Sequence, residues 1–369
     1  MQEFEMTSVR SRGEAVRRFI LENLEAHPKG IVRLTVEQFG ITRQAVHRHL
    51  ANLIKEKAVV TDGNTKSRIY RLAPLSEWCC TFQLDQMTED AVWLVVADQL
   101  GPLPDNVRRI WQYGTTEMFN NVLDHSQARD ATVRVTRTAA STRLTINDTG
   151  VGIFRKIQAA LGLTDERHAV LELAKGKFTT DPKNHSGEGI FFTSRMFDDF
   201  RILSGGVYFS HDFGSEEDWI LENDEEHKPD AQTPGTYVAM RLNNHTARTT
   251  SQVFDQYSDV DVGFTKTVVP VRLAKYGDDN LVSRSQAKRL LARVDRFRTV
   301  VLDFAGLDTI GQAFADQVFR VFAAEHPEVK LVPINADSGI QAMIAHVLRG
   351  APSPTDTLPL FPPPGGSDR

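Results

Sequence analysis

The chain has 369 residues, of which 41% are hydrophobic and 25% charged, which excludes a fully disordered protein and predicts two or three domains with separate cores. No apolar stretch approaches the roughly 18 residues that span a bilayer, and the first residues lack the basic and then apolar pattern of a signal peptide. We therefore expect a cytoplasmic protein that does not enter a membrane.

Charge is distributed unevenly along the chain. Residues 1–75 hold 13 Lys and Arg against 8 Asp and Glu, whereas the remaining residues hold 30 against 40. A basic N-terminal segment on an acidic body predicts a polyanion partner for that segment. The acidic remainder argues against nonspecific coating of nucleic acid or membrane by the whole protein.

The first predicted domain, residues 1–75, consists of helices followed by a hairpin. Apolar residues recur at helical spacing between residues 10 and 55, and residues 58–72 contain two short strand-like runs. Residues 34–53 predict two helices joined by a tight turn at Gly40, with Thr42 capping the second. Side chains expected to reach base edges or phosphates are Arg43, Gln44, His47 and Arg48 on that helix, and Lys66 and Arg68 on the hairpin.

This segment resembles the winged helix-turn-helix domains of bacterial regulators, particularly in FGITRQAVHRHL. The resemblance implies that the second helix enters the major groove of double-stranded DNA. Because the fold alone does not show DNA binding, a winged helix used only for protein contacts stays open as an alternative. A metal site at His47 and His49 is disfavoured, since residues two apart on a helix face different ways.

Residues 76–250 alternate long helical stretches with short strands at 132–135, 143–146 and 237–242, which predicts an α/β sandwich. Glu117, Asn121 and His125 are spaced by four, which places them along one face of a helix. Further along, glycines and polar residues flank apolar runs in Asp148-Thr149-Gly150-Val151-Gly152, Gly187-Glu188-Gly189 and Gly235-Thr236.

These residues suit an ATP site. A carboxylate at a strand end, Asp148, can accept a hydrogen bond from the amino group of adenine, and glycines at a helix start offer N–H groups to phosphates. Asn121 supplies a neutral oxygen suited to Mg²⁺, and His125 is expected to support the site or contact phosphate. Glu117 can orient or deprotonate a water at the γ-phosphate.

In order and spacing, the motifs resemble those of the GHKL ATPase superfamily, which includes gyrase, histidine kinases and anti-sigma-factor kinases. The resemblance implies a Bergerat-type sandwich in which Asp148 recognises adenine and Glu117 stands where hydrolysing members carry their base. It also implies a lid at residues 154–185, where Lys175 and Lys177 either reach phosphate or lie solvated. Further nucleotide contacts are expected from Gly150, Gly152, Gly187, Gly189 and Thr236.

The last predicted domain spans residues 262–350 and is followed by a flexible Pro-rich tail at 351–369. Strands are expected at 268–273, 299–303 and 330–334, and helices at 284–294, 312–324 and 338–348. Residues 300–316 resemble STAS-like domains, the fold of anti-sigma-factor antagonists. The Ser or Thr that a GHKL kinase phosphorylates in those proteins is replaced by Gly311-Gln312-Ala313, and the nearest hydroxyl, Thr309, lies earlier.

The sequence thus predicts a multidomain α+β and α/β protein with a winged helix, a GHKL (Bergerat-type) α/β sandwich and a STAS-like α/β domain. The leading hypothesis is an ATP-binding, nucleotide-gated DNA-binding transcriptional regulator, acting as a homodimer with slow Mg-dependent ATP hydrolysis. One alternative is an anti-sigma-type serine/threonine protein kinase whose partner docks on the STAS-like domain. The other is an ATP-driven DNA clamp in repair or phage defence.

Overall fold

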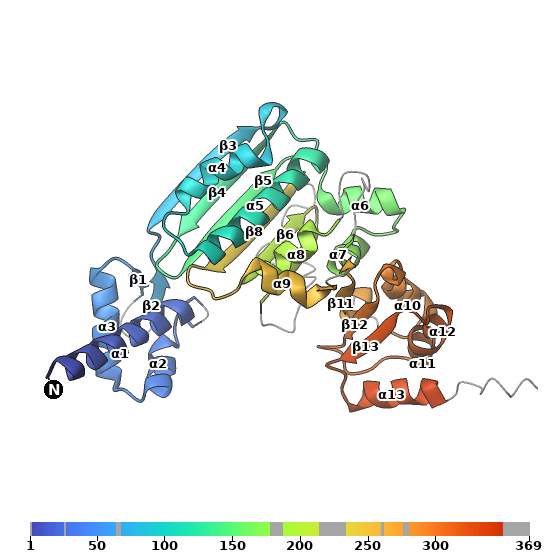
Figure 1. The fold of residues 1–369 in the computed structure, drawn as a ribbon. Coiled ribbons are helices and arrows are strands. Elements are labelled where there is room, and N and C mark those ends of the chain that lie inside the picture. Colours follow the sequence, from blue (N-terminus) through green and yellow to red (C-terminus); the bar gives the residue numbers. More distant parts are fainter. Residues whose placement is uncertain are drawn as a thin grey trace, which may run out of the picture. The chain divides into compact units, whose positions relative to one another are not determined.

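A computed structural model describes residues 2–25, 27–63, 68–177, 187–213, 234–259, 262–275 and 280–349 of the chain. The chain divides into two compact units, Met1–Phe264 and Thr265–Arg369 (Figure 1). The C-terminal domain expected from residue 262 thus begins close to this division. The expected flexible tail lies outside the described residues.

The first unit begins with helices followed by a hairpin, in the order expected. Gly40 ends the second helix with a φ of 60°, a left-handed conformation that glycine adopts readily. The Thr42 hydroxyl caps the third helix by accepting the backbone N–H of Ala45 at 3.2 Å. The elements are α1 (Gln2–Asn23), α2 (Ile31–Phe39), α3 (Arg43–Lys55), β1 (Val59–Asp62) and β2 (Ile69–Leu72).

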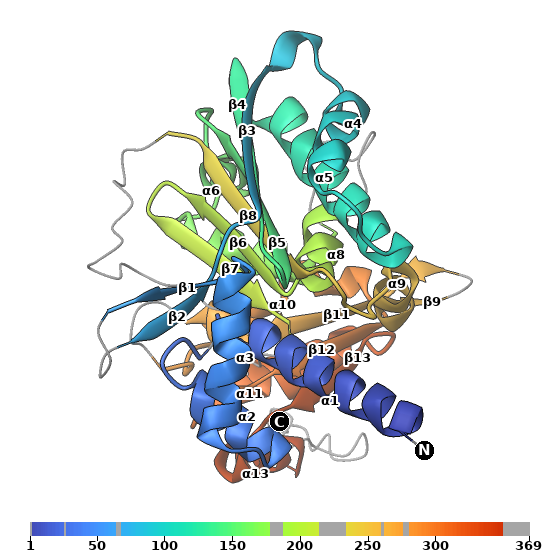
Figure 2. The ribbon, with the colours of Figure 1, turned by 90° about the vertical axis from the view of Figure 1, so that its left-hand side faces the viewer.

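The rest of the first unit is built on an antiparallel sheet with the strand order β3-β4-β5-β8-β6-β7. The helices α4 (Glu89–Gln99), α5 (Asp105–His125) and α8 (Gly189–Met196) lie together against one face of this sheet (Figure 2). The strands predicted at 132–135, 143–146 and 237–242 lie within β4, β5 and β8. The bounds are β3 (Ser76–Gln83), β4 (Asp130–Arg137), β5 (Ser141–Asp148), β6 (Asp199–Ser204), β7 (Val207–Asp212) and β8 (Thr236–Asn243).

Aromatic rings hold the start of α8 in place. Phe191 and Phe192 pack against Tyr257 and Phe264 with ring centroids 4.6 to 6.4 Å apart. These contacts tie α8 to the shorter elements near the end of the unit. The elements near the end of the unit are α9 (Thr250–Tyr257), β9 (Ser258–Asp259) and β10 (Gly263–Phe264), and the other short elements of the unit are η1 (Leu84–Gln86), α6 (Ile153–Leu161) and α7 (Arg167–Lys175).

A short connection joins the N-terminal module, residues 2–72, to the sheet. The backbone N–H of Ala73 donates to Ala58 at 3.0 Å, and that of Leu75 donates to Arg137 at 2.7 Å. Glu25, which follows α1, forms a second link, because its carboxylate accepts from Arg241 Nη1 on β8 at 3.1 Å. The connection is therefore hydrogen-bonded to β4, and the module itself is linked to β8.

The second unit contains a parallel sheet in which β12 lies between β11 and β13. The strands predicted at 299–303 and 330–334 are β12 (Thr299–Asp303) and β13 (Lys330–Ile334). The helices are α10 (Arg284–Leu291), η3 (Val294–Arg296), α11 (Gln312–Asp316), the π-helical turn η4 (Gln317–Phe322), α12 (Ala323–Glu325) and α13 (Ser338–Arg349).

Two elements in the second unit differ from the prediction by more than one residue. The first strand, predicted at 268–273, is β11 (Lys266–Pro270), and the chain continues as the 3₁₀ helix η2 (Val271–Ala274). Pro270 explains the shift, because proline has no N–H to donate to a strand ladder. The helix predicted at 284–294 ends at Leu291, and Arg293 then adopts a left-handed φ of 64°.

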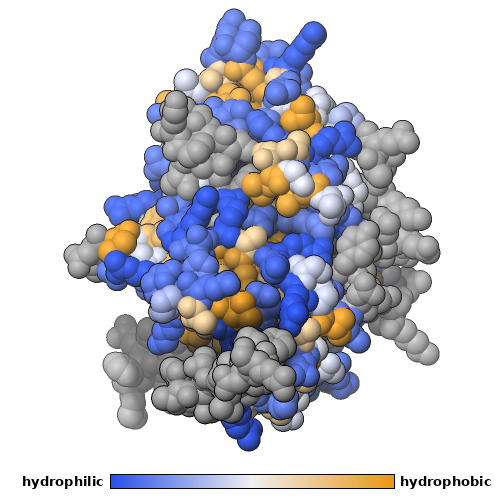
Figure 3. All heavy atoms as spheres, turned by 90° about the vertical axis from the view of Figure 1, so that its right-hand side faces the viewer, coloured by the Kyte–Doolittle hydropathy of each residue, from blue (hydrophilic) through white to orange (hydrophobic). Residues whose placement is uncertain are grey.

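Apolar residues on the face of the protein drawn in Figure 3 lie in small separate groups among hydrophilic ones. Within the part of the chain that the structure describes, no helix is long and apolar enough to cross a membrane.

Candidate functional site

Helix α5 presents Glu117, Asn121 and His125 along one face, and all of them are partly buried. Asn121 and His125 line a pocket together with Asp148 at the end of β5 and Thr236 at the start of β8. Residues predicted from separate motifs are thus brought together by the pairing of β5 with β8 and by the position of α5 against the sheet.

Apolar side chains form most of the pocket wall. They come from α5, α6, α8, β6 and β8, so the pocket lies between the helices and the sheet, and they are Met118, Val122, Ile153, Ile190, Ile202 and Val238. A flat aromatic ring would fit the chemistry of such walls, while the polar groups at the rim and base would fix its orientation.

Asp148 is a buried acidic group of this pocket, with 3% of its surface exposed. Its Oδ1 atom accepts the backbone N–H of Gly150 at 2.8 Å. Burial raises the pKa of the Asp148 carboxyl above its usual value, and the N–H groups of Gly150 and Thr236 oppose that rise. A buried carboxylate held in this way is a strong acceptor for a ligand N–H.

Thr236 pairs with Asp148 across β5 and β8. Its hydroxyl accepts the backbone N–H of Ile153, the first residue of α6, at 3.1 Å. The hydroxyl of Ser204 donates to the backbone oxygen of Gly235 at 2.8 Å. Thr236 therefore joins the start of β8 to the start of α6 and acts on the pocket partly by positioning backbone.

Glycines allow the backbone after β5 to lie against the end of α5. A Cβ on Gly150 would collide with the backbone carbonyl of Ser126, and the same carbonyl accepts the N–H of Val151 at 2.8 Å. Gly152 has a φ of 82°, which a side chain would strain, and it precedes α6. The predicted glycine segment is thus packed directly beside His125 and Ser126.

Gly189 is the first residue of α8, and Gly187, which lies two residues before it, has a φ of 74°. A Cβ on Gly189 would collide with the carboxylate of Glu117. Glu117 therefore lies beside the start of a helix, where backbone N–H groups carry partial positive charge. The predicted base and the predicted phosphate-binding glycines are brought together.

Other ionisable groups gather at the same place. Burial raises the pKa of Tyr113, and the negative charges of Glu117 and Glu188 raise it further. Burial also raises the pKa of Glu188, while the nearby charge of Lys177 lowers it. An anion that binds here would meet the carboxylates of Glu117 and Glu188 as well as helix N–H groups and the charge of Lys177.

The structure buries Lys175, which contradicts the prediction that it lies solvated in the lid. Its side chain is buried, with 1% of the residue exposed, and Nζ lies 2.7 Å from Glu172 Oε1. Lys175 therefore does not lie solvated, because α7 directs it to a buried carboxylate three residues earlier. Lys177 is partly exposed, with Nζ 5.4 Å from the centre of the Phe264 ring.

We expect Lys175→Met to lower the free energy of unfolding of the first unit by about 3 kcal/mol or more, because it leaves Glu172 buried without its ammonium partner. Lys177→Met is the matched control and should change stability little. Adding Glu172→Leu to Lys175→Met should recover most of the loss. Urea unfolding followed by circular dichroism measures the free energy of unfolding of each variant. Equal losses of stability in Lys175→Met and Lys177→Met would contradict a stabilising role for the buried ion pair.

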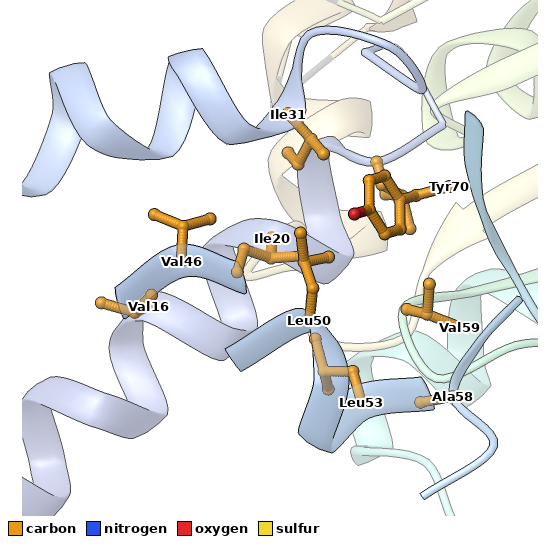
Figure 4. Packing of buried hydrophobic residues seen from close by; sticks show 10 residues of the cluster. Val16, Ile20, Ile31, Val46, Leu50, Leu53, Ala58, Val59 and Tyr70 are labelled. Atoms are coloured by element: carbon orange, nitrogen blue, oxygen red, sulfur yellow. The ribbon is translucent and has the colours of Figure 1, made fainter. Parts of the chain in front are cut away.

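In the N-terminal module, Arg43, Gln44, His47 and Arg48 are exposed on α3, and Arg68 is exposed directly before β2. Lys66 lies outside the described residues. The opposite side of α3 packs into the core of the module, which Figure 4 shows, through Val46, Leu50 and Leu53. The basic face of α3 is thus held outward by a buried face.

Sequence reasoning missed Lys156 and the backbone of Ser126. Lys156 Nζ lies 3.3 Å from Nδ1 of His125, and the Ser126 carbonyl holds the glycine segment. Ser126 directly follows the Glu117 motif, which could have indicated it. No sequence signal indicated Lys156, because its contact with His125 spans 31 residues.

A family model described as a STAS-like domain of unknown function (DUF4325) matches residues 286–341. The match runs from α10 into α13, and it includes β12 and β13. The C-terminal domain is therefore STAS-like, as the sequence predicted. No curated protein matches the chain.

Proposed function

We propose that the chain is an ATP-binding, nucleotide-gated DNA-binding transcriptional regulator with slow Mg-dependent ATP hydrolysis. In this proposal residues 1–75 form a winged helix and residues 76–250 a GHKL-type sandwich. The observation that carries it is that Asn121, Asp148 and Thr236, from three separate segments, line one apolar pocket. The apolar walls suit the faces of adenine, and Asp148 suits its amino group.

Magnesium fits the oxygen donors of this site. Among the described residues, no group of three or more His, Cys, Asp and Glu side chains could hold a metal by itself. A Mg²⁺ would therefore rest on the amide oxygen of Asn121, on phosphate oxygens and on water. It would also offset the carboxylates of Glu117 and Glu188, which otherwise repel phosphate at the start of α8.

Contacts within the first unit support coupling between nucleotide and DNA. Thr236, at the start of β8, lines the pocket, and Arg241 on the same strand binds Glu25 of the N-terminal module. A displacement of β8 on nucleotide binding would therefore reach the module. For this to change DNA affinity, ATP has to bind the two arrangements with different affinity.

The DNA contact is tested on α3. Replacing Arg43 and Arg48 by Ala should weaken DNA binding by about 10-fold or more and reduce its dependence on salt, because each arginine reads a base or neutralises a phosphate. Arg134→Ala, an exposed arginine on β4, is the control and should leave binding unchanged. Fluorescence anisotropy on a pool of the organism's own upstream fragments measures the affinity. Equal binding by the double variant and the wild-type chain would make the module a protein-contact domain.

The STAS-like match favours a second candidate, an anti-sigma-type serine/threonine kinase with a separate protein partner. Within the chain itself, α11 begins after Gly311 without a hydroxyl at its cap, and Thr309 is exposed before it. Incubation of the chain with labelled ATP and cell extract discriminates the candidates. Label on a partner protein supports the kinase, whereas free phosphate alone supports the switch.

A further inference from the structure

Lys156 on α6 places its ammonium group at the C-terminal end of α5. Its Nζ atom lies 3.4 Å from the backbone oxygen of Asp124, 3.1 Å from that of His125 and 3.3 Å from Nδ1 of His125. An ammonium has three N–H donors, so each of these atoms can take one. The negative end of the α5 dipole also favours a cation at this point.

Lys156 stays charged in this environment for a physical reason. Burial lowers the pKa of its ammonium, and the carboxylate of Asp124 opposes that change. The backbone oxygens accept hydrogen bonds that only the protonated and donating amine supplies in full, so they favour the charged form. A charged Lys156 can donate to His125 and cannot accept from it.

We infer that Lys156 is a positioning residue that fixes the tautomer of His125, with the ring proton on Nε2. Nδ1 accepts from the ammonium, and a neutral imidazole then carries its proton on the other nitrogen. His125 lines the pocket beside Asn121 and Asp148. The ring is therefore set as a hydrogen-bond donor, although Lys156 itself does not line the pocket.

The tautomer defines which ligand atom His125 can bind. A ring with Nε2–H can donate to any acceptor atom of ATP, and the phosphate oxygens are its charged acceptors. This part of the inference rests on the proposed function. The state of the ring does not, because it follows from contacts inside the protein.

Nitrogen NMR of the full chain labelled at histidine tests the ring directly, since protonated and unprotonated ring nitrogens differ widely in chemical shift. The His125 signals are assigned from a His125→Gln spectrum. Near neutral pH and without nucleotide, we expect a protonated Nε2 and an unprotonated Nδ1. Lys156→Met should give a mixture of ring forms, and Lys156→Arg should restore the single form, because arginine also only donates.

Affinity for ATP gives the second readout. Lys156→Met should weaken ATP binding about 3- to 10-fold, the effect of losing one oriented hydrogen bond, and Lys156→Arg should recover most of it. Arg155→Met is the matched control, because Arg155 is the neighbouring cation on α6 and pairs with Glu166 on the surface. Thermal unfolding checks that each variant is folded.

A proton on Nδ1 in the wild-type chain, or a ring unchanged in Lys156→Met, would overturn the inference. If the spectrum shows His125 with its proton on Nε2 but the chain does not bind ATP, the tautomer is established and the proposed function is overturned. If His125 carries its proton on Nε2 but Lys156→Met binds ATP as tightly as the wild-type chain, His125 does not donate to the nucleotide. That result overturns the inferred role of His125 in binding.

Discussion

Asp148→Asn should lower the affinity for ATP by about 100-fold or more without unfolding the protein. In the wild-type chain the N–H of Gly150 donates to Asp148 Oδ1, and the amide oxygen of the Asn can still accept this hydrogen bond. Its NH₂ group then faces the amino group of adenine, so a donor meets a donor where the carboxylate accepted. The loss of a charged acceptor and the unpaired donors together account for the expected magnitude.

Stability separates this effect from misfolding. Burial raises the pKa of Asp148, which indicates that burying its ionised carboxylate is unfavourable. A neutral amide at this position should therefore lower the free energy of unfolding only slightly in the absence of nucleotide. Titration calorimetry with Mg-ATP measures affinity, and thermal unfolding measures stability. Asp130→Asn, at the start of the neighbouring strand β4, is the control. Unchanged ATP affinity in Asp148→Asn would show that the pocket does not recognise adenine through this carboxylate.

Gly150→Ala should destabilise the first unit by about 3 kcal/mol or more and impair nucleotide binding with it. The added Cβ collides with the backbone carbonyl of Ser126, and backbone cannot move aside as a flexible side chain can. Relief would require the glycine segment to separate from the end of α5, which would also break the hydrogen bond from Val151 to Ser126.

Gly162→Ala is the matched control for this substitution. Gly162 follows α6 with a φ of 60°, and a Cβ there meets nothing within 4 Å. Gly162→Ala should lower the free energy of unfolding by about 1 kcal/mol, because alanine is strained in the left-handed backbone conformation. Urea unfolding compares both variants with the wild-type chain. A loss in Gly150→Ala no larger than that in Gly162→Ala would contradict the packing described for the pocket.

The sequence indicated elements whose local chemistry is strong. Thr42 caps α3 as expected, and β12 begins and ends at the predicted residues because an apolar run is bounded by polar ones. The spacing of Glu117, Asn121 and His125 placed them correctly on one helix face. Local pattern suffices where a single helix or strand decides the outcome.

Long-range contacts could not be predicted in this way. β3 was not predicted as a strand, and in the structure it is an edge strand on which only Phe82 is buried. The burial of Lys175 depends on how α7 packs, and the contact between Lys156 and His125 depends on how α6 meets the end of α5. Each of these results from tertiary structure rather than from neighbouring residues.

We propose that this chain couples a nucleotide pocket to DNA binding. Fluorescence anisotropy of the purified wild-type chain and of Asp148→Asn should be measured on the upstream-fragment pool with Mg-ATP, with Mg-ADP and without nucleotide. We expect a selected fragment whose affinity for the wild-type chain changes with Mg-ATP and whose affinity for Asp148→Asn does not. DNA affinity that is the same in every nucleotide state, or that changes equally in both proteins, would contradict it.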